Sequence, residues 1–260
     1  MRRFDHLELQ PATTQDATIG LTREPDRDEH HWMQAALDER RTGNAEAALR
    51  YYSRALESNR SVAAAWAGQV RMLIAMGEYP EADLWARKAL ELFKNNADLL
   101  AGRAQALCRT GDLKTAQASC DAAISQPGMS SYPWLARGEL MLARRESTAD
   151  YCFDKAVQLD ADWLVLLEIA EVFRHYGRRA KALVWATRTV ERAPDSPHVW
   201  CRRGELEREM GLLVAAERSF RACVQLSPHH RVAGGHLLQL ANDRRGLRNW
   251  FKRVFRIGHR

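Results

Sequence analysis

Apolar and small residues recur along this chain at a fixed interval of 34 residues, and the interval predicts pairs of helices. Glycine marks the interval at Gly43, Gly77 and Gly111, and again at Gly177 and Gly211. A tryptophan or leucine lies 11 residues before each turn position, at Trp32, Trp66, Leu100, Trp134, Leu166 and Trp200. Alanine follows each glycine at Ala48, Ala82, Ala116, Ala182 and Ala216.

Good helix formers stand on both sides of each glycine, about 13 residues before it and about 14 after it. Glycine ends the first helix and lets the chain turn back, and the small residues let the two helices approach closely. One such hairpin cannot bury both of its faces, so neighbouring hairpins must stack. No segment alternates with a period of two, so the sequence predicts no strand.

This pattern resembles the tetratricopeptide repeat (TPR) family. The family's aromatic, small, small and proline positions are occupied in the last unit by Trp200, Gly204, Ala216 and Pro228. The resemblance covers six units, residues 29–62, 63–96, 97–130, 131–162, 163–196 and 197–230. It implies an all-α fold, an α-α superhelical solenoid of TPR helical hairpins with a C-terminal capping and amphipathic helix. The first helix of each hairpin would line a concave groove.

The fourth unit, residues 131–162, departs from this pattern. It is two residues shorter than the other units, and Arg145 stands where they have glycine. We expect an altered turn at this point and not a lost repeat.

The two ends of the chain fit no repeat. Residues 1–28 are polar, so we expect an extended or disordered segment, whose scattered apolar residues would otherwise pack on the first unit or on a partner. Residues 231–245 are predicted to form a capping helix, because a solenoid needs one to cover its last apolar face. Residues 246–260 are predicted to form a separate basic amphipathic helix.

The basic surplus of the chain lies in this tail. The whole chain carries a net charge of +6, whereas residues 231–260 alone carry eight basic residues against one acidic residue. Apolar residues form one stripe of the last helix and basic residues the other side, and together they include Arg248, Trp250, Phe251, Lys252, Arg253, Phe255 and Arg256. Three interpretations stay open: a second half of the cap, a helix on an anionic membrane surface, or a contact with an acidic protein or nucleic acid.

The sequence predicts no catalytic residues, no cofactor and no metal site. The densest imidazole cluster is His229, His230 and His236, and we interpret it as solvated because no cysteine or carboxylate nearby completes a ligand set. The five cysteines are odd in number and form no CxxC pair, so we expect reduced, buried thiols.

By resemblance to the family, side chains of the first helices would line a partner groove. These residues are Arg40, Arg71, Gln105, Arg109, Glu139, Glu168, Glu171, Arg202 and Glu205. Their order suggests a groove that is basic in its early units and acidic in its later ones. The alternative is a solvated surface whose charges only keep the protein in solution.

The function that we expect is a non-enzymatic scaffold or adaptor that binds a partner protein or peptide in this groove, with the basic tail as a second contact. The alternative is a peripheral membrane or secretion-complex adaptor held by the C-terminal helix. An enzyme on a helical scaffold is the third hypothesis, and nucleic acid is a less favoured partner. The first ten residues do not resemble a signal peptide, so we expect a cytoplasmic location, with a membrane-peripheral one as the variant.

Overall fold

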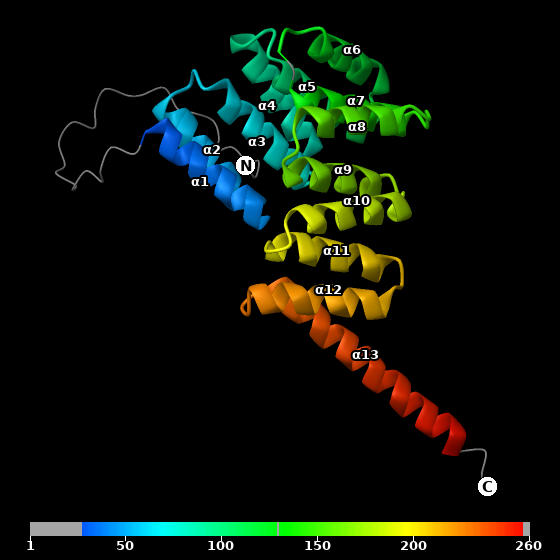
Figure 1. The fold of residues 1–260 in the computed structure, drawn as a ribbon. Coiled ribbons are helices and arrows are strands. Elements are labelled where there is room, and N and C mark those ends of the chain that lie inside the picture. The colour runs from blue at the N-terminus through cyan, green and yellow to red at the C-terminus, as the bar shows by residue number, and fades with distance from the viewer. Residues whose placement is uncertain (1–27, 129, 257–260) are drawn as a thin grey trace, which may run out of the picture. The chain divides into compact units, whose positions relative to one another are not determined.

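The computed structural model describes the backbone of residues 28–128 and 130–256, and side chains up to residue 243 (Figure 1). Every regular element within these ranges is a helix, so the all-α prediction is confirmed. The chain divides into two compact units, unit 1 (Met1–Ala156) and unit 2 (Val157–Arg260). The N-terminal segment predicted over residues 1–28 lies, apart from Asp28, outside the described residues.

Unit 1 holds the first eight helices of the described chain. They are α1 (Glu29–Thr42), α2 (Ala45–Ser58), α3 (Ala63–Ala75), α4 (Tyr79–Leu92), α5 (Ala97–Thr110), α6 (Leu113–Ile124), α7 (Ser131–Ala143) and α8 (Ala149–Leu159), whose last three residues belong to unit 2. The second helix of a hairpin packs back on the first, as α2 does on α1 and α6 on α5. First helices also touch one another, because α5 contacts both α3 and α7. We call the side of the unit that these helices form the first-helix face.

Unit 2 contains the remaining described helices, and from the second of them onward each packs on the one before it. They are α9 (Trp163–His175), α10 (Arg179–Arg192), α11 (Pro197–Glu209), α12 (Leu213–Leu226) and α13 (Arg231–Arg256). Helix α13 is continuous through Gly246, so one helix covers both the predicted capping segment and most of the predicted basic segment. Ala233, Leu237 and Leu240 join its first turns to the core of the unit, and Figure 1 shows the helix continuing past α12.

The first hairpin turn shows how glycine closes a helix in this chain. Gly43 adopts the left-handed conformation with φ 84°. Its N–H donates to the Arg40 carbonyl at 3.1 Å, and the Asn44 N–H donates to the Glu39 carbonyl at 2.9 Å. These two bonds satisfy carbonyls that a helix end otherwise leaves without partners.

The turn of the fourth repeat keeps this closure although it lacks glycine. Arg145 takes the left-handed conformation with φ 62°. Its N–H donates to the Leu142 carbonyl at 3.0 Å, and the Glu146 N–H donates to the Met141 carbonyl at 2.8 Å. The hydrogen-bonded closure is thus the same as in the glycine turns, and the predicted alteration of the turn lies in the residues that follow it. The connection after the closure is two residues longer than in the other repeats, because α8 begins four residues after Arg145, whereas the other second helices begin two residues after their glycine.

Small residues bring the helices of successive elements into contact with buried aromatic rings. A Cβ atom on Gly68 of α3 would lie 2.4 Å from the ring of Tyr52 in α2. In unit 2, a Cβ atom on Gly204 of α11 would lie 2.7 Å from the ring of Phe220 in α12. Both distances are shorter than any real contact, so only glycine allows these approaches.

Candidate functional site

A buried polar cluster joins α5 to α7 on the first-helix face of unit 1. We call its three members, Gln105, Arg109 and Glu139, the Glu139 cluster. Arg109 Nε donates to Glu139 Oε1 at 2.7 Å, and Gln105 Nε2 donates to Glu139 Oε2 at 2.6 Å. The Glu139 side chain has no exposed surface, and that of Arg109 is 10% exposed. Three residues predicted to line a groove are thus brought together, and they bind one another.

Electrostatics keeps Arg109 in this cluster charged. Burial lowers the pKa of Arg109, but the charge of Glu139 and the hydrogen bonds to it outweigh burial and raise that pKa above its ordinary value. A buried carboxylate and a buried guanidinium each avoid a large desolvation cost only while both are present. The cluster therefore links two repeats, and it is not a set of free binding groups.

Two further predicted groove residues lie elsewhere in unit 1. The guanidinium carbon of Arg71, on α3, stands 3.9 Å from the ring centroid of Tyr132 on α7, which is a cation–π contact. Arg40 lies in the last turn of α1, where a positive charge favours the helix end. The structure does not bring Arg40 into the Glu139 cluster.

A second set of charges, which we call the charged network, joins α9 to α11 in unit 2. Arg202 contacts Glu171 and Glu205 through Nη2 and Nη1, each at 2.6 Å. Arg174 contacts Glu171 at 3.4 Å, and its Nε donates to Glu209 Oε1 at 3.0 Å. The network contains three of the predicted groove residues, Glu171, Arg202 and Glu205, and a fourth, Glu168, lies half-buried on α9.

The charged network differs from the Glu139 cluster in its exposure to solvent. The side chains of Arg174 and Glu209 are 25% and 30% exposed, and that of Glu205 is 15% exposed. Burial lowers the pKa of Arg174, but its hydrogen bond and charge contacts with the glutamates outweigh burial and raise that pKa. The network therefore presents arginines paired with glutamates that solvent and a partner can reach.

A histidine lies next to this network at the start of α11. Burial and, to a smaller extent, the Arg202 charge lower the pKa of His198 to about 4, although Glu171 opposes them. The folded protein therefore holds His198 neutral at ordinary pH.

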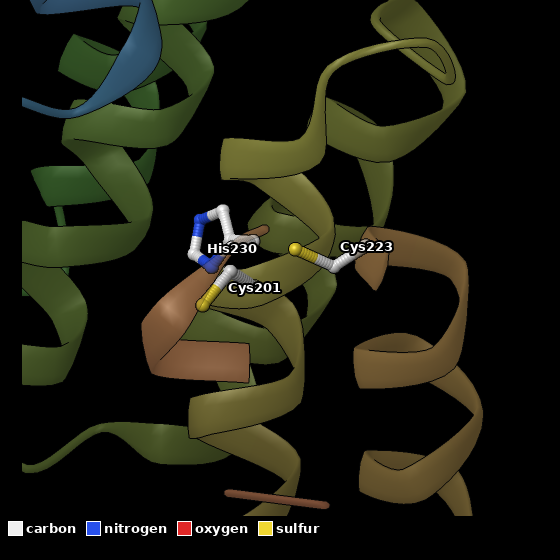
Figure 2. Close-up of side chains that lie close together, drawn as sticks. All are labelled: Cys201, Cys223 and His230. Atoms are coloured by element: carbon white, nitrogen blue, oxygen red, sulfur yellow. The ribbon is translucent and has the colours of Figure 1, made fainter. Parts of the chain in front are cut away.

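Unit 2 also brings together two cysteines and a histidine from separate parts of the sequence. One ligand atom from each of Cys201, Cys223 and His230 lies within 4.8 Å of the other two (Figure 2). All five cysteines are buried and free, as predicted. The prediction that no cysteine lies near the C-terminal histidines is wrong for His230, because the hairpin of α11 and α12 carries both thiols to it.

The remaining predictions concern the tail and the membrane. Arg248, Trp250, Phe251, Lys252, Arg253, Phe255 and Arg256 belong to α13 by their backbone, and their side chains lie outside the described ones. Within the described residues, none of the helices combines the length and the apolar character that crossing a bilayer requires.

Three solved structures found by comparison are similar to this chain in fold. The crystal structure of the Cut9–Hcn1 hetero-tetramer of APC/C is 14% identical, has a TM-score of 0.48 and aligns with 82% of this chain, which spans only 43% of that one. TTC0263, a thermophilic TPR protein of Thermus thermophilus, is 16% identical with a TM-score of 0.49, over 82% of this chain and 98% of the other. YrrB, a TPR protein with an unusual peptide-binding site, is 18% identical and has a TM-score of 0.38. The alignment covers 70% of this chain and 95% of YrrB. No family model and no curated protein matches the sequence.

The chain's own features show its fold. Helix pairs recur with the 34-residue period, they are closed by left-handed residues at Gly43, Gly77, Gly111, Arg145, Gly177 and Gly211, and they pack on their neighbours within each unit. A sequence period that matches a structural period of helical hairpins confirms, within each unit, the stacked hairpins that the resemblance to the tetratricopeptide repeat family implies.

Proposed function

We propose that this protein is a non-enzymatic interaction scaffold that holds a partner protein or peptide against the first helices of its repeats. The observation that supports this proposal is the contrast between its two sets of charges. The Glu139 cluster is buried and has no surface to offer, whereas the charged network on α9 and α11 is fixed in place and partly exposed. We therefore assign the principal partner contact to the charged network.

The chemistry of the charged network selects the kind of partner. Each of its glutamates contacts an arginine, so the face offers alternating charges and not a purely acidic surface. An arginine has five donors in a planar fork, and those not used internally remain for a carboxylate or a backbone carbonyl of the partner. Because the pairs already fix the side chains, binding loses less rotamer freedom than it would on a flexible charged surface. We expect a partner segment of mixed charge.

A neutral double substitution tests this proposal without a change in net charge. The variant Arg174→Ala with Glu209→Ala removes the pair that these two residues form between α9 and α11. It also removes the contacts of Arg174 with Glu171 and Glu205 and that of Glu209 with Arg179. The matched control, Glu217→Ala with Arg221→Ala, removes the 2.6 Å pair on α12. Each tagged chain would be used to capture proteins from the native lysate, with crosslinking and mass spectrometry to locate the contact.

The expected result is a partner that crosslinks to α9 and α11, is retained by the control and is lost from the network variant. Because the deleted pairs are partly exposed, both variants should unfold within about 1 kcal/mol of the wild type. Capture that is equal in both variants, or crosslinks confined to α10 and α12, would refute the assignment.

The alternative that the chain is an adaptor at an anionic membrane surface rests on the tail. Helix α13 continues past α12 to Arg256, so its backbone has the form that an amphipathic membrane contact requires. Flotation with anionic vesicles compares the full chain with one ending at Arg245. Flotation of the full chain alone would support this alternative, and flotation of neither chain would exclude it.

A further inference from the structure

The thiols of Cys201 and Cys223 and the ring of His230 converge on one point in unit 2. Cys201 lies on α11, Cys223 lies near the end of α12, and His230 directly precedes α13. Figure 2 shows the three side chains close together between these elements. Both cysteines are buried, and His230 is half-buried.

The spacing of these three groups is close to that of metal ligands. Zinc binds thiolate sulfur at about 2.3 Å and imidazole nitrogen at about 2.0–2.1 Å, which separates the ligand atoms of a tetrahedral site by roughly 3.4–3.8 Å. The three atoms here lie within 4.8 Å of one another, so shifts of about 1 Å or less would bring them onto one ion. The close packing of Gly204 on Phe220 holds α11 near α12 and so fixes the two thiols beside each other.

The surroundings of the two thiols also favour a ligand role. The Cys201 sulfur lies 3.9 Å from Glu205 Oε1, so a carboxylate stands beside the cluster.

His230 already uses its available ring nitrogen in the protein without metal. The Ala233 N–H donates to His230 Nδ1 at 3.2 Å, which caps the first turn of α13. A neutral imidazole has a lone pair on only one nitrogen. A metal ion therefore has to compete with the Ala233 amide for it, and this hydrogen bond must break when the ion binds.

We propose that Cys201, Cys223 and His230 form a binding site for one thiophilic divalent cation, Zn²⁺ by preference. Two thiolates and an imidazole suit zinc and exclude magnesium and calcium, which prefer oxygen ligands. Each thiol loses its proton to solvent on binding, so two protons are released for each ion, and the fourth position falls to water or to Glu205. The ion would tie the last hairpin to the start of α13.

Cobalt titration of the full-length chain, reduced with a phosphine that does not bind metals, tests the site. The expected result is one Co²⁺ per chain, with a thiolate-to-cobalt charge-transfer band and intense tetrahedral bands that disappear when Zn²⁺ is added. The variants Cys201→Ser, Cys223→Ser and His230→Gln should each bind at least tenfold more weakly. Cys152→Ser, a buried thiol of unit 1, and His229→Ala, the exposed neighbour, should bind like the wild type.

Two measurements on the wild-type chain guard against variants that fail to fold. Zn²⁺ should slow the alkylation of Cys201 and Cys223 but not that of Cys152, as read by mass spectrometry. It should also shift the amide resonance of Ala233, because that N–H loses its acceptor. The proposal is overturned if the reduced wild type gives no thiolate-to-cobalt band, if the cysteine variants bind Co²⁺ as tightly as the wild type, or if Zn²⁺ protects neither thiol.

Discussion

Removing the charge of Glu139 is the sharpest test of how these repeats are held together. In Glu139→Gln the shape is kept, but one carboxylate oxygen becomes an NH₂ group that faces the donors of Gln105 and Arg109. Arg109 then retains a charge with 10% of its side chain exposed and no carboxylate beside it. Breaking a buried ion pair by removing one partner costs about 3–5 kcal/mol. For a unit of this size, that loss lowers the unfolding midpoint by roughly 10 °C.

Urea and thermal unfolding followed by far-ultraviolet circular dichroism measure this loss. Glu209→Gln is the matched control, because the same change in the partly exposed charged network should cost about 1 kcal/mol or less. The double variant Arg109→Met with Glu139→Leu removes both charges and should recover most of the stability, since well-packed apolar residues replace a buried pair at little cost. The reasoning fails if Glu139→Gln is no more destabilising than Glu209→Gln.

Three further changes test the backbone, the packing and the pH dependence. Gly68→Ala should lower the free energy of urea unfolding by about 1–3 kcal/mol, because the added methyl group meets the Tyr52 ring. The control Gly235→Ala on α13 meets no neighbouring atom and should be neutral or stabilising. Equal effects of the two changes would contradict the close approach at Gly68. Arg145→Gly should stabilise by about 1 kcal/mol, because an L-residue is strained at φ 62°, and an unchanged calorimetric midpoint would show no strain. The pKa of His198 is about 4 in the folded protein and 6.5 in the unfolded chain. Neutral His198 therefore adds up to about 3 kcal/mol to the free energy of unfolding above pH 6.5, and this stability is lost as the pH falls toward 4. His198→Gln should flatten the stability profile over that range, and an unchanged slope would refute the assignment.

The sequence predicted the helices well because the repeat fixes them locally. Glycine, alanine and the helix-forming segments act within one hairpin, and their period shows where each hairpin begins. The sequence predicted an altered turn at Arg145 but not its left-handed closure, because neighbouring hydrogen bonds hold an arginine in a conformation that favours glycine. Residue type predicts what a backbone prefers, whereas the fold decides what it adopts.

The pairing of charges was not predicted, although the period contains a signal for it. Gln105 and Glu139 are 34 residues apart, and Arg174 and Glu209 are 35 apart, so each pair spans one repeat. Residues one repeat apart on first helices face each other on adjacent helices, and opposite charges at that spacing can be expected to bind each other. An experiment that reverses Arg109 to glutamate would therefore unfold the chain and would not report on a partner.

The thiol cluster could not be predicted by searching for ligands close together in the sequence. Cys201 and Cys223 are 22 residues apart, and the distance closes only because α11 and α12 form a hairpin. Cys223 occupies a position where the earlier repeats have alanine, namely Ala55, Ala89 and Ala123. A reactive side chain at a small-residue position that faces the partner helix is the sign that sequence reasoning could have used.

The Glu139 cluster also bears on how such a chain can change during evolution. Arrays of this kind gain or lose whole modules, and a module that only shares apolar contacts with its neighbours can be duplicated or deleted at modest cost. Here the third and fourth modules share one buried charge, which neither satisfies alone. Those two modules can be inherited only together and in this order, so any shuffling of the array should spare the junction between them.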